Sequence, residues 1–150
     1  MLKAVNGLQF LAIATLSSFL AHPSNAESVT LTVVERATTD AVTDTGATGD
    51  SPGDILTFAN ELFDKDNTTK VGTDNGYCIR TAAGMAWECA FTNNLEGGQI
   101  SVTGSFLDAG DSVLTIAGGT GAYKGASGEM LLHARDAEGA AYDFVFTVNF

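Results

Sequence analysis

The sequence predicts an all-β protein that folds as one closed, eight-stranded antiparallel β-barrel. Apolar and polar residues alternate with a period of two along eight segments, and glycine, aspartate, asparagine or proline residues lie between them. No segment shows a convincing helical period of apolar residues. Strands joined by short turns leave two unpaired edges unless the sheet closes on itself, which favours a barrel over an open sheet.

The expected strands differ little in length and are separated mostly by short turns. In chain order they are 28–37, 54–63, 76–82, 85–92, 99–106, 112–117, 128–136 and 141–150. The longest interval, Thr38 to Gly53, is rich in Thr, Asp and Gly and has no apolar period. We interpret it as a flexible loop at one mouth of the barrel, which serves either as a binding lid or as a disordered connection. An eight-stranded barrel is filled by side chains or holds one small ligand.

The first 26 residues have the features of a secretory signal peptide. A short basic start, "MLK", precedes the apolar stretch "LQFLAIATLSSFLA", and a small-residue cleavage site ends at Ala26. The alternative is a membrane anchor, but this run is shorter than the roughly 20 apolar residues that a spanning helix needs. We therefore expect a signal peptide over 1–26 and a single secreted barrel domain over 27–150, outside the cell or in the periplasm.

The charge balance limits the classes of partner. Seven Lys and Arg residues stand against 18 Asp and Glu residues, for a net charge of −11. Nucleic acid and anionic membranes are therefore not expected as partners, and solubility alone explains the acidity. Beyond the signal segment the only histidine is His133, which we expect on the outer face of a strand. No His/Cys zinc cluster can be assembled from one histidine, so no metal site is predicted.

The two cysteines lie in the segment "CIRTAAGMAWEC", which is typical of a hairpin. If its turn is the doublet Ala83-Gly84, then Cys78 and Cys89 stand opposite each other as a hydrogen-bonded pair, within disulfide range. A bulge or a longer loop would shift this register. Exported proteins form and keep such bridges, which favours a disulfide over two free thiols. A bridged Cys78 is not a thiolate nucleophile.

The glycine-rich run "GGTGAYKGASG", Gly118 to Gly128, has two interpretations, a phosphate-binding loop and a turn between strands. A Walker loop needs Ser or Thr after its lysine, but Lys124 is followed by Gly125. The segment that follows alternates like a strand instead of opening a helix. We therefore predict a sharp strand-to-strand passage in which glycines are needed for backbone conformation.

Two polar residues interrupt the apolar inward faces of the first two segments. Side chains alternate between the faces of a strand, so Glu35 and Asn60 each share a face with apolar residues. Those apolar neighbours are Val29, Leu31 and Val33 for the first, and Leu56, Phe58 and Leu62 for the second. Buried polar groups are costly unless they are satisfied, so both residues are candidates for a site. The alternatives are that Glu35 points to solvent at a strand end and that Asn60 binds neighbouring backbone.

Apolar residues, most of them aromatic, share an inward face on two later segments. The first set is Met85, Trp87, Cys89 and Phe91, and the second is Tyr142, Phe144, Phe146 and Phe150. Such residues line an apolar pocket or simply form the core. The hydroxyl group of Tyr142 needs a hydrogen-bond partner, which makes Tyr142 a third polar candidate.

Four motifs occur in a characteristic order along the chain: "GDILTFANELFD", "VGTDNGYC", "LEGGQISVTG" and "LTIAGGTGAYKGASGEM". Together they resemble the allene oxide cyclase and dirigent superfamily over almost the whole mature chain, and the run from Ile116 to Gly128 is the most specific part. The resemblance implies a calycin-like barrel of eight antiparallel strands with an apolar cavity. It also implies a homotrimer, since members are commonly trimers, and no metal or organic cofactor.

In the cyclase branch of this superfamily, a glutamate, an asparagine and a cysteine on the first three strands line the cavity. By resemblance these positions are Glu35, Asn60 and Cys78. The asparagine helps to hold a water that binds the substrate epoxide oxygen, and the glutamate assists ionisation and stabilises positive charge. A second asparagine of plant members is replaced here by Ala37. We expect substrate contacts from Cys78 together with Phe58, Trp87 and Tyr142.

The sequence thus leads to three functional hypotheses. The first is a secreted, cofactor-independent cyclase or isomerase that acts on a small hydrophobic substrate, allene-oxide-like or polyunsaturated, with Glu35 and Asn60 as catalytic residues. The second is a dirigent-like protein that steers the coupling of phenoxy radicals made elsewhere, which needs several hydrogen-bonding groups around its pocket. The third is a non-catalytic barrel that binds hydrophobic ligands.

Overall fold

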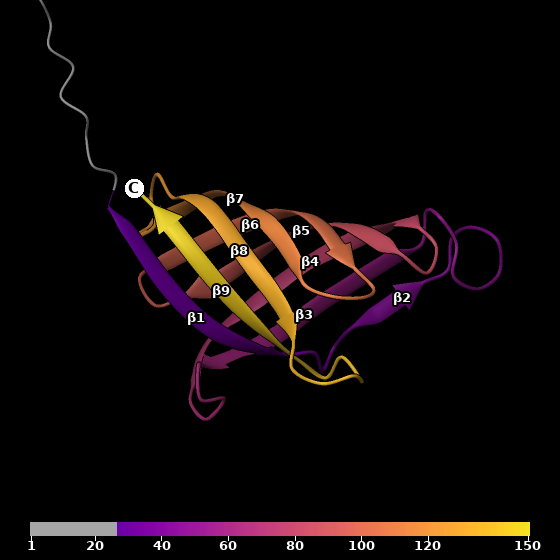
Figure 1. Cartoon of the computed structure of the whole chain (residues 1–150), viewed down its shortest axis with the longest axis horizontal. Helices are drawn as coiled ribbons and strands as arrows, with labels where there is room; N and C mark the ends of the chain where they lie inside the picture. Colours follow the sequence, from indigo (N-terminus) through magenta and orange to yellow (C-terminus); the bar gives the residue numbers. More distant parts are fainter. Residues whose placement is uncertain (1–26) are drawn as a thin grey trace, which may run out of the picture.

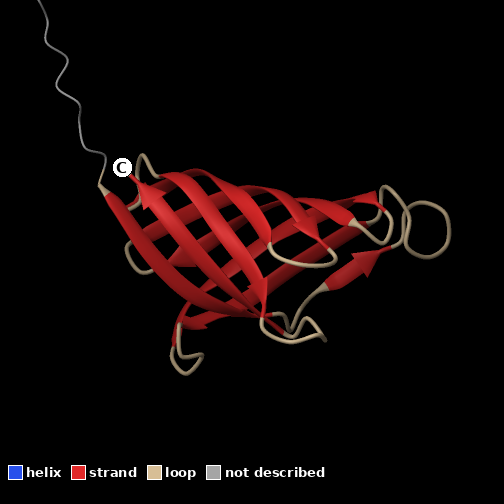
Figure 2. Cartoon of the chain, viewed as in Figure 1, coloured by secondary structure: helices blue, strands red, loops and turns tan. Residues whose placement is uncertain are grey.

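The structure is a computed structural model that describes residues 27–150, and the expected signal peptide, 1–26, lies outside the described residues. Its strands are β1 (Ser28–Arg36), β2 (Ala41–Thr43), β3 (Ile55–Asp64), β4 (Lys70–Ala82), β5 (Ala86–Leu95), β6 (Gly98–Leu107), β7 (Ser112–Gly121), β8 (Ser127–Ala134) and β9 (Ala141–Asn149). They form one antiparallel sheet in the order β1-β9-β8-β7-β6-β5-β4-β3-β2, and β1 also pairs with β3 (Figures 1 and 2). The predicted closed eight-stranded barrel is therefore confirmed, with β2 as one extra strand.

Strand β2 lies within the interval that the sequence assigned to a loop. Strand β1 pairs with the C-terminal part of β3, and β2 pairs with the N-terminal part of β3. Both therefore lie along the same edge of β3, one after the other. The ladder is interrupted over residues 37–40, between the pairs Arg36↔Glu61 and Ala41↔Thr57. This interruption is at the mouth of the barrel, and it positions part of the site described below.

Strand β4 begins at Lys70, earlier than the expected start at Gly76. Its first half lacks an apolar period because Gly72 and Gly76 occupy inward positions. These glycines are required by close packing, since a Cβ at Gly76 would lie 2.2 Å from the Cβ of Phe91. A strand whose small residues fit against a neighbour gives no hydrophobic alternation, which is why its first half was missed.

The β4–β5 hairpin differs from the predicted two-residue turn. Ala82 pairs with Ala86, so the turn contains three residues, and a bulge near Thr81 compensates for the extra residue. Cys78 is therefore still opposite Cys89. Met85 lies in the turn and is exposed, which corrects its assignment to the interior. The same correction applies to Phe150, which is also exposed, next to the end of β9.

The glycine-rich run is a passage between strands, as predicted. Strand β7 continues to Gly121 and β8 begins at Ser127. Gly121 has a φ of 59°, in the left-handed region that favours glycine, and a Cβ there would lie 2.1 Å from the carbonyl oxygen of Gly97. His133, on β8, is exposed and contacts Asp111 on the outside of the barrel, as expected.

Large apolar side chains fill most of the barrel interior. The largest that are fully buried include Phe144, Phe146, Leu62, Ile100, Leu114 and Met130. Within residues 27–150, no helix is long and apolar enough to cross a membrane. The dense core leaves space at the barrel end where β1 finishes and β9 begins.

Candidate active site

A small cavity lies at the end of the barrel near the β1–β2 interruption. Its volume is about 40 Å³. Its wall consists of Glu35, Asp40, Leu56, Phe58, Cys78, Cys89, Phe91, Phe106, Leu132 and Tyr142. Most of these residues are apolar or aromatic, so the few polar groups in the wall face a poorly solvated space. In such a space electrostatic interactions are stronger than in water.

Glu35 is the most buried acidic group in this wall. It is in β1, opposite Leu62 of β3 and Tyr142 of β9, and only 6% of its surface is exposed. The side-chain amide of Asn60 donates a hydrogen bond of 2.8 Å to Oε1 of Glu35. Glu35 therefore points inward, as face alternation predicted, and the alternative of a solvent-facing strand end is wrong.

Asn60 connects Glu35 to the segment that interrupts the β1–β2 edge. Its Oδ1 accepts hydrogen bonds from the backbone N–H groups of Thr38 (3.1 Å) and Thr39 (3.0 Å) and from the Thr39 hydroxyl (2.9 Å). Its Nδ2 donates to Asp40 (2.7 Å) as well as to Glu35. Asn60 is buried and is not part of the cavity wall. Its carboxamide takes the place of the missing backbone ladder and holds residues 37–40 at the cavity mouth.

Asp74 is a buried acid that sequence reasoning missed. It is in β4, opposite Asn60 on one side and Asn93 on the other, and 1% of its surface is exposed. Neither of its carboxylate oxygens has a hydrogen-bond donor among the described residues, and Oδ1 of Asn93 also lacks one. Asp74 shares the inward face of β4 with Cys78, so alternation from the cysteine could have identified it. Gly72 and Gly76, on either side of Asp74, hid this face.

The electrostatic environment favours the protonated form of both buried acids. Burial, followed by the negative charge of Asp74, raises the pKa of Glu35 well above its usual value, and the hydrogen bond from Asn60 opposes this only in part. Burial likewise raises the pKa of Asp74 to about 6. The Asp40 carboxylate adds to the repulsion on both groups. Burial, and then the charge of Glu35, also raises the pKa of Tyr142.

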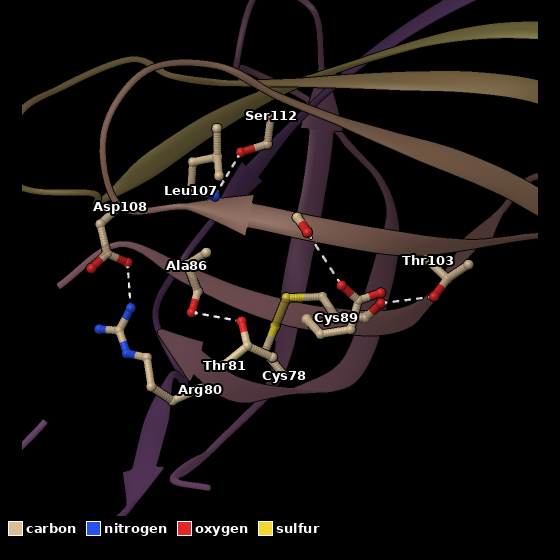
Figure 3. The surroundings of a disulfide bond; sticks show 11 residues. Cys78, Arg80, Thr81, Ala86, Cys89, Thr103, Leu107, Asp108 and Ser112 are labelled. Carbon is tan, nitrogen blue, oxygen red and sulfur yellow. Dashed lines mark hydrogen bonds and ion pairs between the residues drawn. A yellow bond between two sulfur atoms is a disulfide. The ribbon is translucent and has the colours of Figure 1, made fainter. Parts of the chain in front are cut away.

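The two cysteines form a disulfide, shown in Figure 3. Both residues line the cavity. Their Cα atoms are 4.0 Å apart, which fits a closely spaced, non-hydrogen-bonded pair in place of the expected hydrogen-bonded one. The disulfide is consistent with an oxidising compartment. Cys78 is therefore placed in the wall but is not a nucleophile.

The remaining expected contact residues divide between the cavity and the core. Phe58 and Tyr142 line the cavity, whereas Trp87 does not. The Trp87 ring is buried beneath the guanidinium group of Arg80, 4.1 Å from the ring centroid. Phe91, which the sequence placed on an inward face, also lines the cavity. Three further wall residues were not identified from the sequence: Asp40, Phe106 and Leu132. In the part of the chain that the structure describes, no three His, Cys, Asp or Glu side chains are arranged to hold a metal ion.

Known structures share this architecture. A solved structure of a pyocyanin demethylase is 25% identical, with a TM-score of 0.68, and the match covers 79% of this chain and all of that one. A pterocarpan synthase dirigent protein is 16% identical, with a TM-score of 0.65 and coverage of 83% and 86%. The Diels-Alderase AbmU from Streptomyces koyangensis is 11% identical, with a TM-score of 0.65 and coverage of 85% and 70%. The last two likenesses concern the fold alone.

A comparison of the sequence with protein families agrees with the motifs and the barrel. The model described as "Allene oxide cyclase" matches residues 29–135, which is most of the chain and includes Glu35, Asn60 and both cysteines. The protein therefore belongs to the allene oxide cyclase family.

Proposed function

We propose that this protein is a cyclase or isomerase that acts without a cofactor on a small hydrophobic molecule, allene-oxide-like or polyunsaturated. The observation that carries this proposal is a buried carboxyl group, Glu35, in the wall of a mostly apolar cavity. Asn60 fixes the orientation of that group through a hydrogen bond of 2.8 Å. Membership of the allene oxide cyclase family supports the same class of reaction.

The arrangement suits a reaction in which charge separates within the substrate. A preorganised charged or polar group stabilises such charge most strongly where water is excluded, because no solvent has to reorganise. The aromatic walls would hold a flexible substrate in one folded conformation and so set the stereochemistry of ring closure. In this proposal Glu35 is the catalytic residue, and Phe58, Cys78 and Tyr142 contact the substrate.

Substrate binding requires the cavity to enlarge. Pockets for small organic ligands usually measure about 300–1,000 Å³, far more than the 40 Å³ of this cavity. The segment 37–40 at the mouth is held by the side chain of Asn60, by a backbone hydrogen bond from Ala37 to Ala140 and by a bond from the Ala59 N–H to the Thr39 hydroxyl. We therefore assign Asn60 two roles, orienting Glu35 and fastening this segment, and movement of the segment would also give Asn60 access to a bound water.

The test is to supply the mature protein with an allene oxide generated in place and to measure the enantiomeric excess of the cyclic product. The wild-type protein should give an excess of one enantiomer. Glu35→Gln should lower the rate of enantioselective cyclisation by about 10²–10³-fold, the usual effect of removing one preorganised electrostatic group. Asn60→Ala should also lower it, and Glu61→Gln, an exposed change on β3, should not. Racemic product from the wild-type protein would refute the cyclase proposal.

A dirigent-like function is the second candidate, supported by one observation. Three hydrogen-bonding side chains, Glu35, Asp40 and Tyr142, lie in the same wall, which suits a phenolic ligand. The test is to couple phenoxy radicals, generated by a separate oxidase, with and without the protein. An enantiomer ratio that changes with the protein would support this function, and an unchanged ratio would exclude it.

We also propose that the barrel is secreted after removal of residues 1–26 and assembles as a homotrimer. Secretion is supported by the Cys78–Cys89 disulfide and by the pattern of the leader in the sequence. The trimer rests on the resemblance to a family whose members are commonly trimers. Mass spectrometry of the exported protein should show a chain that begins at Glu27, and light scattering should give three times the mass of one chain. An intact leader or a monomeric mass would contradict the respective part of this proposal.

A further inference from the structure

We propose that Glu35 and Asp74 form a buried acid pair that shares one proton, with Asp74 as a positioning residue behind Glu35. The two residues come from β1 and β4, the strands on either side of β3. Asn60, on β3, lies between them in the sheet. Only the catalytic significance of the pair rests on the proposed function, since the pair itself is a property of the folded protein.

The first argument is the hydrogen bonding of Asp74. Both of its carboxylate oxygens are buried without a donor among residues 27–150. Asn60, which donates to Glu35, stands directly opposite Asp74 in the β3–β4 ladder, so the two acids flank one carboxamide. A side-chain hydrogen bond between the two acids accordingly affects the pKa of each. Oε1 of Glu35 already accepts from Asn60. A proton on the other Glu35 oxygen would give Asp74 the hydrogen bond that it lacks, and no other described side chain offers one.

The second argument is the charge that surrounds the pair. The charged group on the nearby 37–40 segment is Asp40, another acid, and its negative charge disfavours ionisation of both partners. The other polar groups nearby are neutral: Asn60 on β3, Asn93 on β5 and Tyr142 on β9. Two ionised carboxylates in a buried site without a cation repel each other strongly, so retention of one proton is the favourable state.

The consequence for function is a single negative charge shared between Glu35, in the cavity wall, and Asp74 behind it. A singly charged pair stabilises developing positive charge on a substrate without two repelling charges in the protein. When the pH falls below about 6, the pair takes up a second proton and becomes neutral. The shared proton thus keeps the charge of the site constant above that pH until the remaining proton is lost.

The experiment is to follow the side-chain carboxyl carbons of Glu35 and Asp74 by ¹³C NMR as a function of pH, without substrate. In the wild-type protein both carbons should titrate together in two steps, one near pH 6 and one at higher pH. In Asp74→Asn, Glu35 should titrate in one step at lower pH, because the neutral amide removes a charge and can donate a hydrogen bond. In Glu35→Gln, Asp74 should likewise lose the second step.

Glu61→Gln is the matched control, because Glu61 adjoins Asn60 on β3 but is exposed and pairs with Lys70. It should leave both titrations unchanged. Two independent single steps near the ordinary carboxyl range in the wild-type protein would overturn the pair. A Glu35 titration that is the same in Asp74→Asn as in the wild-type protein would also overturn the pair. Because no substrate is present, a protein that fails to cyclise but shows coupled steps would refute the proposed function and keep this inference.

The role of Asp74 in catalysis has its own readout, which rests on the proposed function. In wild type, kcat should fall with decreasing pH near pH 6, as the pair becomes neutral. In Asp74→Asn this fall should move to lower pH, because Glu35 alone then carries the charge. A purely structural role would change kcat without moving its pH dependence, and that result would overturn the positioning role.

Discussion

Strand β4 carries two buried charged residues on the same inward face, and their surroundings are opposite. Arg80 is neutralised by two carboxylates, from Asp50 and Asp108, and its guanidinium group covers the ring of Trp87 (Figure 3 shows the contact with Asp108). Among residues 27–150, Asp74 has neither a cation nor a hydrogen-bond donor other than the proton proposed on Glu35. Both residues are costly to bury, but only Arg80 is compensated by the protein around it.

The compensated residue has a structural purpose. Arg80 connects β4 to the loop before β3 through Asp50 and to the end of β6 through Asp108. Asp50 also accepts a hydrogen bond from the backbone N–H of Gly84 in the β4–β5 turn. The difference between the two sites teaches that burial of charge alone does not identify a functional group. A buried charge that the surrounding protein does not compensate is the better indicator of a functional group, because folding gains nothing from burying it.

The largest expected effect on stability comes from breaking the compensated site. Arg80→Ala should lower the free energy of unfolding by about 2–4 kcal/mol, because it leaves two carboxylates unpaired and uncovers Trp87. The value is below that of a fully buried pair because both carboxylates are partly exposed. Chemical denaturation monitored by Trp87 fluorescence would measure it. Arg80→Lys, which keeps the charge but not both contacts, should lose less. An unchanged midpoint for Arg80→Ala would remove the structural interpretation.

The disulfide lies between the two sites on β4, and its removal should have the next largest effect. Replacing Cys78 and Cys89 together by serine should lower the free energy of unfolding by about 2–3 kcal/mol, as the chain-entropy model gives for a short loop. A reductant should produce a similar shift in the wild-type protein. The loss should be the same in an Arg80→Lys background, since the sites do not share hydrogen bonds. A clearly larger loss there would show that the two regions are coupled.

The uncompensated site should respond in the opposite direction. Asp74→Asn should raise the free energy of unfolding at pH 8 by about 1–2 kcal/mol, because it removes a buried carboxyl that must ionise without a cation. Glu61→Gln is the control and should change stability little. Destabilisation by Asp74→Asn at pH 8 would mean that Asp74 is a structural residue like Arg80.

The same site predicts how stability depends on pH. The pKa of Asp74 is raised from 3.8 to about 6 in the folded state, so the folded protein binds more protons than the unfolded chain between these values. The stability that the folded protein gains from this protonation is fully present below pH 3.8 and is lost as the pH rises through about 6. Denaturation midpoints should show this loss in wild type but not in Asp74→Asn. Asp64 opposes it, because hydrogen bonds from Thr68 and Thr69 lower its pKa to about 2 and its contribution disappears in acid.

Much of the barrel could be predicted because its signal is local. Alternation of side chains identified Glu35 and Asn60 as inward residues, and eight strands joined by short turns indicated closure. The prediction of a two-residue turn was wrong. The bulge near Thr81 and the extra turn residue have opposite effects on the register, and alternation of side chains cannot detect either one. Asp74 was missed because glycines surround it on its face. Its importance depends on donors that are absent from neighbouring strands, a property that no single segment of sequence contains.

The smallest expected effect concerns the segment 37–40 at the mouth of the cavity. The Thr39 hydroxyl donates to Oδ1 of Asn60 and accepts from the backbone N–H of Ala59 (2.8 Å). Thr39→Val removes both hydrogen bonds at nearly constant volume, at a cost of about 1 kcal/mol. The segment should then open more often, so the amides of Thr38 and residue 39 should exchange faster and an apolar fluorescent dye should bind faster.

The control for this change is Thr57→Val, an exposed substitution on the same strand as Asn60. It should leave exchange at Thr38 and dye uptake unaltered. If Thr39→Val speeds exchange without speeding dye uptake, residues 37–40 do not control access to the cavity, and ligands reach it by another route. If it speeds both while the coupled titration of Glu35 and Asp74 persists, closure of the mouth and the acid pair are separable properties of this end of the barrel.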